Sequence, residues 1–200
     1  LMVIDPNNHR DEPGALFSFK GASSSGTGIV AVSITLGVAE ALARAPRRPE
    51  RSVLFVLFAG EEQATDGSRF FVEHPPVPVE RIVAMINVDC VGRGSGTLQL
   101  GGGKSFPKLH ALATGIDAGM GHHVDGDTWY GGGADAEAFF RHQVPILYVH
   151  AADGYAHLHL PSDTPDTLDP ALLERAARLV HAVVEEVARG GYEREPLAPR

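Results

Sequence analysis

The sequence of 200 residues has one cysteine, Cys90, so an internal disulfide bond is excluded. One thiolate also cannot build a zinc site of the kind that needs two to four cysteines. Any metal ion bound by this chain would therefore be held by histidine, aspartate and glutamate. No apolar run approaches the roughly 20 residues that a membrane-spanning helix needs, and no signal peptide is visible. The chain opens at Leu1 inside an apolar stretch without an initiator methionine, and we expect a processed or truncated product whose compartment stays open.

Basic residues are also few, with 17 Lys and Arg against 25 Asp and Glu and a net charge of -8. This balance argues against binding to nucleic acid or to an anionic membrane surface, since both attract basic patches. A solubilising acidic surface explains the surplus, and so would a carboxylate-rich metal site counted without its metal. With 44% hydrophobic residues, the length and composition are those of one globular domain.

Apolar strand-like runs alternate with helical patterns along the chain. The pattern predicts strands at residues 1–4, 52–58, 81–88, 97–100 and 145–149, and helices at 28–43, 66–73, 107–118, 134–142 and 170–188. Continuous apolar strands indicate a mainly parallel α/β sheet with helices on both faces. We assign residues 1–190 to one domain and residues 191–200, which are charged and rich in proline, to a C-terminal tail.

Three polar signals follow predicted strands or precede the last helix. Glu61 and Glu62 come directly after the strand 52–58, and in an extended segment they would point to opposite sides. One carboxylate could then bind a metal while the other addresses a water molecule, although an exposed acidic loop is the simpler explanation. Asp89 ends the strand 81–88, where a carboxylate must be paired, metal-bound or part of a turn. His159 lies in a loop where zinc binding or plain solvent exposure is possible.

The order of these motifs resembles that of the co-catalytic zinc aminopeptidase family, which includes glutaminyl cyclases and non-catalytic relatives such as the transferrin receptor ectodomain and nicastrin. The resemblance also includes GASSSGTG at 21–28, GADAEAF at 133–139, HQVPILYV at 142–149 and DTPDTLDP at 163–170. It implies the three-layer αβα zinc-exopeptidase (phosphorylase/hydrolase-like) fold with a mainly parallel mixed sheet, here without its N-terminal part.

The resemblance also implies roles for the polar residues. Glu61 would be the general base that deprotonates the attacking water. Glu62 and His159 would hold one zinc ion, and Asp89 would hold the other. Asp135 would lie beside the metal pocket, and Asn87 would support the ligands from behind.

The sequence departs from the family pattern at the bridging ligand, an aspartate that is here Ser23. A neutral hydroxyl cannot offset the repulsion of two close dications, so we expect one zinc ion rather than two. His9 is the favoured remaining histidine ligand, and the alternative alignment places Asp5 there. Leu158 stands where many family members have a tyrosine that steadies the oxyanion.

These observations favour a zinc-dependent aminopeptidase that acts on a peptide or small aminoacyl substrate. The first alternative is a catalytically impaired binding protein with a peptidase fold, because Ser23 replaces the bridging aspartate. A single-zinc enzyme of the glutaminyl cyclase kind is the second. The sequence predicts no nucleic-acid partner and no membrane span, and it leaves the oligomeric state open.

Overall fold

The computed structural model describes the backbone of residues 1–4 and 26–200, and the side chains of residues 1 and 30–200. The strands are β1 (Met2–Ile4), β2 (Ser52–Leu54), β3 (Ile82–Val88), β4 (Leu98–Gly101) and β5 (Ile146–Ala151). The helices are α1 (Gly26–Ala43), α2 (Asp66–Glu73), α3 (Pro107–Gly119), α4 (Ala136–Arg141) and α5 (Pro170–Ala188), with short 3-10 turns η1 (Val79–Arg81) and η2 (Pro165–Thr167). No helix in this described part is both long and apolar enough to cross a membrane.

The sheet is mixed, with strand order β2-β1-β3-β5-β4. Among the strands of the described residues, β3 and β5 alone pair in parallel, while the β1–β2, β1–β3 and β4–β5 pairs are antiparallel. The expected mixed sheet is therefore confirmed, but its parallel share among the described strands is smaller than predicted. The reason is that a continuous apolar run reports burial on both faces and not strand direction, which depends on how the strands connect.

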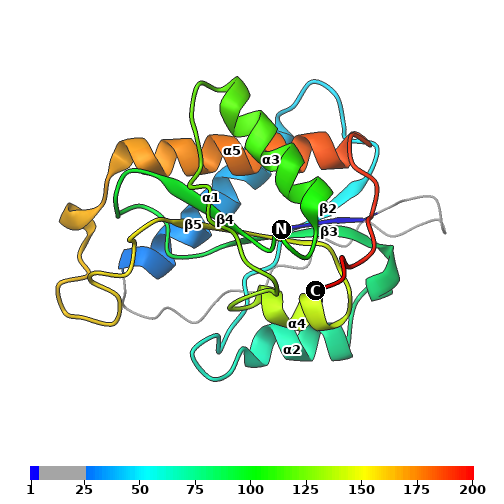
Figure 1. Ribbon diagram of the computed structural model, residues 1–200, viewed down its shortest axis with the longest axis horizontal. Coiled ribbons are helices and arrows are strands. Elements are labelled where there is room, and N and C mark those ends of the chain that lie inside the picture. The colour runs from blue at the N-terminus through cyan, green and yellow to red at the C-terminus, as the bar shows by residue number, and fades with distance from the viewer. Residues whose placement is uncertain (5–25) are drawn as a thin grey trace.

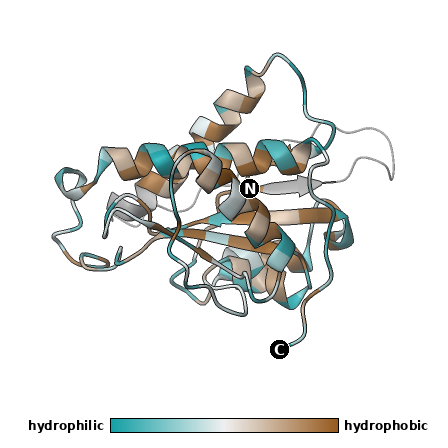
Figure 2. Cartoon of the chain, turned by 45° about the horizontal axis from the view of Figure 1, so that its top comes forward, coloured by the Kyte–Doolittle hydropathy of each residue, from teal (hydrophilic) through white to brown (hydrophobic). Residues whose placement is uncertain are grey.

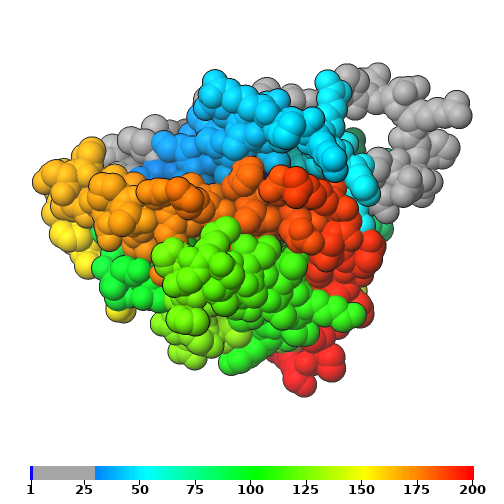
Figure 3. Space-filling model, turned by 90° about the horizontal axis from the view of Figure 1, so that it is seen from above, coloured from blue at the N-terminus to red at the C-terminus, as the bar shows by residue number. Residues whose placement is uncertain are grey.

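Helices cover both faces of this sheet and complete three layers (Figure 1). The α1, α3 and α5 helices lie on one face, with α5 between the other two when seen from above (Figure 3), and α2 and α4 lie on the other face. Hydrophobic residues follow the strands between these layers (Figure 2). The largest fully buried side chains include Phe106, Phe139, Met85 and Leu179, which come from different elements and join one core.

Strand direction brings three loops to one edge of the sheet. The β3 and β5 strands are parallel, and β2 points the same way because both β2 and β3 are antiparallel to β1. The segments that follow β2, β3 and β5 therefore all leave the sheet on the same side. These segments carry the residue pair 61–62, residue 89 and residues 152–169, respectively.

Candidate metal centre

Glu61 and Glu62 lie in a turn between β2 and α2. The ladder of β2 ends at Leu54, four residues earlier than the sequence predicted, and the pair follows Gly60, whose φ is +68°. Backbone N–H groups of Gln63 and Asp66 both donate to the Gly60 carbonyl, at 3.1 Å each. The extended backbone expected at the pair is therefore wrong, because the chain turns there.

Glu62 and His159 come together from two loops. The Glu62 Oε1 atom lies 3.3 Å from the His159 Nε2 atom, and the two side chains are 55% and 57% exposed. His159 has a φ of +61°, in the left-handed region that a non-glycine residue adopts at a cost of about 1–3 kcal/mol. A carboxylate oxygen and an imidazole nitrogen at this separation are a donor pair that zinc accepts.

A second group of predicted residues surrounds a small cavity beneath the sheet edge. Asn87, Asp89 and Asp135 all line this space of about 50 Å³. Asn87 and Asp135 are buried and Asp89 is half-buried. Asp135 occupies the N-cap position of α4, yet its side chain does not cap the helix. The Asp135 side chain thus lies at the cavity and does not cap α4.

Asp89 is held by its neighbours on both oxygens. The Tyr148 hydroxyl on β5 donates to Asp89 Oδ2 at 2.8 Å, and the Cys90 thiol donates to Oδ1 at 3.5 Å. Burial raises the pKa of Tyr148 far above its ordinary value, and the Asp89 charge adds to this shift. Tyr148 is therefore always protonated at physiological pH and always able to donate.

Tyr155 connects the two groups of candidate residues. Burial, followed by the neighbouring Cys90, raises the pKa of the Tyr155 phenol, and the charges of Asp89 and Glu61 contribute to the same shift. The Tyr155 ring packs against His150 at 5.9 Å between centroids. The loop that carries His159 therefore contacts β5 through Tyr155 and the Glu62 turn through His159.

An aromatic cluster extends from this point along β5. His150 packs against Trp129 and Tyr148 at centroid distances of 5.5 and 5.4 Å. The Trp129 Nε1 atom also donates to the Gly132 carbonyl at 3.2 Å, and the Tyr130 hydroxyl donates to the Ala198 carbonyl at 3.1 Å. These contacts support a role of Trp129 and Tyr130 in anchoring their loop.

The other loop histidine, His157, bonds locally. Its Nδ1 atom lies 2.9 Å from Ser162 Oγ, which closes a turn within the loop. This contact leaves His159 as the histidine that faces Glu62.

The structure brings together two of the residues that the sequence predicted as metal ligands. Within residues 1 and 30–200, no three His, Cys, Asp or Glu side chains gather closely enough to hold a metal ion by themselves. Glu62 and His159 provide two suitable donors at one spot, and Asp89 lies at the same edge of the sheet. The predicted ligand His9, its alternative Asp5, and Ser23 at the bridging position lie outside the described residues.

Sequence reasoning did not find Tyr148 and Tyr155 as neighbours of the site. Tyr148 is one residue of an apolar strand, and its bond to Asp89 joins positions 59 residues apart. The register of β3 against β5, which pairs Asn87 with Tyr148, produces this contact. No local pattern in the sequence predicts the register of β3 against β5.

Carboxylates and a histidine on loops at one edge of a mixed sheet between two helical layers define an α/β fold of the zinc-exopeptidase class. Residues 7–184 match Peptidase family M28. This match covers most of the chain, so the protein belongs to that family, and the resemblance drawn from the motifs is confirmed. No curated protein sequence matches it.

Solved structures with the same fold are aminopeptidases and glutaminyl cyclases. The LapA aminopeptidase of Legionella pneumophila superposes with a TM-score of 0.71 and 20% identity over 82% of this chain and 46% of that chain. The aminopeptidase from Aneurinibacillus sp. strain AM-1 gives 0.72 and 17% over 99% and 47%. A glutaminyl cyclase of Porphyromonas gingivalis gives 0.63 and 17% over 79% and 61%. The chain thus spans about half the length of the aminopeptidases that it matches.

Proposed function

We propose that this protein is a zinc-dependent aminopeptidase that hydrolyses N-terminal peptide bonds of peptides or small aminoacyl compounds. The observation that carries the proposal is the carboxylate–imidazole pair of Glu62 and His159, 3.3 Å apart, with Glu61 beside it in the same turn. Membership of Peptidase family M28 supports the reaction class.

Zinc is held in this proposal by Glu62 and His159, with Asp89 and His9 as further ligands, and one ion is bound rather than two. Zinc held by these residues would supply Lewis-acid chemistry, namely polarisation of the scissile carbonyl group and a lowered pKa of a water molecule. Glu61 accepts the proton of the attacking water and later delivers it to the leaving amine.

Three residues support the ligands. Asn87 and Asp135 line the small cavity with Asp89, and we assign them to holding that carboxylate and the water structure around it. Tyr148 donates to Asp89 Oδ2 and keeps that oxygen in one orientation. The Glu61 side chain is only half-buried, so a substrate can reach it from solvent.

Hydrolysis of aminoacyl anilides that release a dye tests this proposal. We expect zinc-dependent turnover by the wild-type chain and a loss of at least 100-fold in the Glu61→Gln variant, since general-base catalysis typically contributes 10²–10⁴-fold. The Glu61→Gln variant should bind as much zinc as the wild type. Turnover that is unaffected by chelation or equal in the two proteins would contradict the assignment.

A catalytically impaired, substrate-binding peptidase fold is the second candidate, and Ser23 at the bridging position favours it. Under this alternative, purified protein carries substoichiometric zinc and shows no turnover, and the Ser23→Asp substitution raises the zinc content. Unchanged metal content in Ser23→Asp would show that the alignment of that segment is wrong.

A cyclase activity is the third candidate, since glutaminyl cyclases are among the structures that share the fold. Formation of pyroglutamate from a peptide with N-terminal glutamine distinguishes it from hydrolysis.

A further inference from the structure

The loop that carries His159 is attached to the loop that follows Asp89 at both of its ends. The backbone N–H of Ser95 donates to the Ala152 carbonyl at 3.0 Å, where the His159 loop begins. The backbone N–H of Asp169 donates to the Gly92 carbonyl at 2.6 Å, where the loop ends and α5 begins. The two loops therefore meet along residues 92–95.

Glycine permits this close approach. A Cβ atom placed on Gly94, whose φ is +132°, would lie 2.0 Å from the Ala152 carbonyl oxygen. Only a residue without a side chain fits there. The packing of the two loops is thus built into the sequence at this position.

A buried ion pair lies between these two backbone contacts. The Arg93 Nη2 atom is 2.8 Å from Asp163 Oδ1, and the two side chains are only 6% and 1% exposed. The same Arg93 nitrogen donates to the Thr164 carbonyl at 3.3 Å and to the Thr167 hydroxyl. One guanidinium from the Asp89 loop therefore binds three groups of the His159 loop.

Each residue of the Arg93–Asp163 ion pair follows a candidate ligand by the same number of residues. Arg93 lies four residues after Asp89, and Asp163 lies four residues after His159. Burying two charges is costly unless they are paired with good geometry, and replacing such a pair by apolar residues is often tolerated. A buried ion pair is thus weak evidence for a stabilising role, whereas these contacts do hold the two loops together. His159 itself has a left-handed backbone that the rest of the loop must hold in place.

We propose that the Arg93–Asp163 ion pair is a positioning device that fixes the His159 loop on the Asp89 loop and so sets the arrangement of these two metal ligands. This inference rests on the proposed function for the role of the ligands, while the attachment of the loops stands on its own contacts. Arg93 and Asp163 touch neither metal nor substrate in this scheme and act only through the ligands.

A second buried Arg–Asp pair in the same chain provides a matched control. The Arg175 Nη2 atom lies 2.8 Å from Asp117 Oδ2, and these side chains are 11% and 0% exposed. This pair joins α5 to α3, and Arg175 Nη1 also donates to the Gly96 carbonyl at 3.4 Å, but neither partner is hydrogen-bonded to the His159 loop. Replacing each pair by Met and Leu removes the same charges and similar contacts in two different places.

The test compares Arg93→Met/Asp163→Leu with Arg175→Met/Asp117→Leu by zinc affinity, measured in competition with a chelator, and by amide hydrogen exchange. We expect zinc binding at least tenfold weaker and faster exchange at residues 153–164 in the first variant only. Arg93→Lys, which keeps the charge but loses the fork of donors, should give an intermediate loss, and it replaces the double variant if that one does not fold.

Zinc affinity within twofold of the wild type in the Arg93 variants, or an equal loss in the Arg175 control, would overturn the positioning role. If the wild-type chain binds no zinc, the proposed function fails, and the exchange rates then decide on the loop attachment alone. Unchanged exchange at residues 153–164 in the Arg93 variants would overturn that attachment.

Discussion

The hydroxyl of Tyr148 and the carboxylate of Asp89 form a pair in which the donor cannot lose its proton under ordinary conditions. Their oxygens are 2.8 Å apart, and burial keeps the pKa of Tyr148 well above its usual range. A donor of this kind fixes the orientation of the carboxylate to which it donates. The ring of Tyr148 also packs on Trp129 and His150, so the hydroxyl itself has little freedom to move.

We therefore expect the Tyr148→Phe variant to bind zinc about 10- to 100-fold more weakly, the range found when such supporting partners are lost. Its free energy of unfolding without zinc should fall by only about 0.5–1.5 kcal/mol, the net contribution of one hydrogen bond. Tyr130→Phe is the control, because it removes a hydroxyl that donates to the Ala198 carbonyl away from the candidate ligands. Chelator competition on both proteins checks this, and equal affinities would show that Tyr148 does not act through Asp89.

His150 predicts a pH dependence of stability. It is buried within the aromatic cluster, and burial lowers the pKa of its imidazole below the ordinary 6.5. Between the lowered value and 6.5, the unfolded chain binds more protons than the folded chain, so the free energy of unfolding rises with pH. The stability that neutral His150 contributes is fully present above pH 6.5, and it is lost as the pH falls through the folded-state pKa of His150.

Urea unfolding of the protein in chelator, from about pH 8 to about pH 5, should thus show falling stability, and His150→Phe should reduce that fall. His110 has a pKa shifted in the same direction by burial, so part of the slope will remain. A slope that is identical with and without the His150 ring would contradict this account.

At the scale of elements, the sequence predicted helices better than strands. The bounds of α2 and α5 are as expected, because each has a polar start and a clear apolar stripe, and α5 has Asp169 as N-cap, which accepts from Ala171 and Leu172. The β2 strand is shorter than predicted because an apolar run reveals burial rather than hydrogen-bonded pairing. Phe58, beyond the end of β2, packs on Phe71 and Phe139 outside any ladder.

The sequence predicted those residues of the candidate site that lie in loops directly after strands. Glu62 and His159 were named from the sequence, and the structure brings them into contact. The Arg93–Asp163 pair was not, since its partners are 70 positions apart and each is an ordinary charged residue in a loop. Pairing of that kind follows from the meeting of two loops and not from any local spacing.

The α1 helix shows that an apolar composition does not by itself mean burial on every side. Its residues are apolar nearly all round, which predicts a helix that is buried on every side. In the structure Ile34 is buried at 6% exposure while Leu36, two positions on, is 44% exposed. One face of α1 packs on α5 and the sheet, and Gly37, Val38 and Ala41 beside that face border an open groove that Met120 and His181 also line.

The two positions therefore make a matched pair for mutation. Ile34→Ala should lower the free energy of unfolding by about 2–5 kcal/mol, as large-to-small changes in cores do. Leu36→Ala should change it by less than about 0.5 kcal/mol. Urea midpoints measure both, and a large loss for Leu36→Ala would show that this face is covered in solution, for example by a second copy of the chain.

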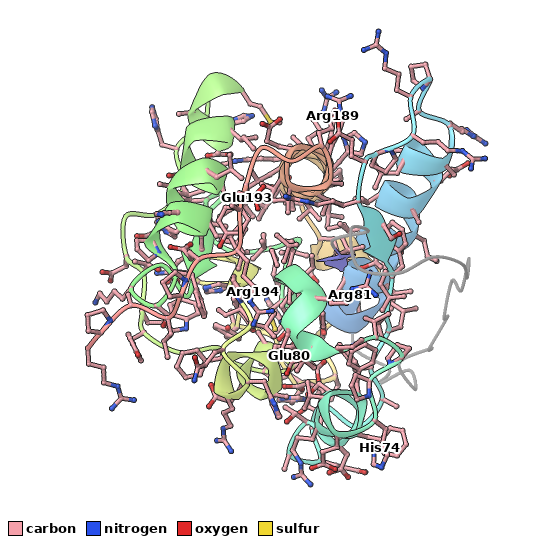
Figure 4. All side chains as sticks on the ribbon, turned by 90° about the vertical axis from the view of Figure 1, so that its right-hand side faces the viewer. His74, Glu80, Arg81, Arg189, Glu193 and Arg194 are labelled. Atoms are coloured by element: carbon pink, nitrogen blue, oxygen red, sulfur yellow. The ribbon has the colours of Figure 1, made fainter. Side chains whose placement is uncertain are left out.

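At the scale of the whole molecule, the last nine residues join parts of the domain that are distant in sequence. Composition suggested a tail, and the structure shows it packed along the surface with Tyr192 and Glu195 buried. Figure 4 labels Arg194 together with Glu80 and Arg81 of the η1 turn. The Arg194 guanidinium donates, at 2.7–3.0 Å, to the carbonyl groups of Val79, Glu80, Ile82 and Gln143. The segment thus connects the starts of β3 and β5.

Glu195 carries the strongest of these connections. Its carboxylate accepts hydrogen bonds from the backbone N–H groups of Lys108 and Leu109, at 3.0 and 2.8 Å, in the first turn of α3. The Tyr192 hydroxyl donates to the same carboxylate at 3.0 Å. Free N–H groups and the positive end of the dipole at a helix N-terminus stabilise an anion there. Glu195 therefore acts as a capping residue supplied from the far end of the chain.

Removing this carboxylate should destabilise the whole domain, because it leaves two helix N–H groups and a buried hydroxyl without their acceptor. We expect Glu195→Ala to lower the free energy of unfolding by about 3 kcal/mol, since hydrogen bonds to a charged group contribute about 1.5–3 kcal/mol each and are not additive. Glu193→Ala is the control two residues away: its ion pair with Arg51 involves a carboxylate that is 80% exposed, and the loss should be under about 1 kcal/mol. Urea unfolding monitored by Trp129 fluorescence separates the two cases, and equal midpoints would mean that the C-terminal segment does not anchor α3 in solution.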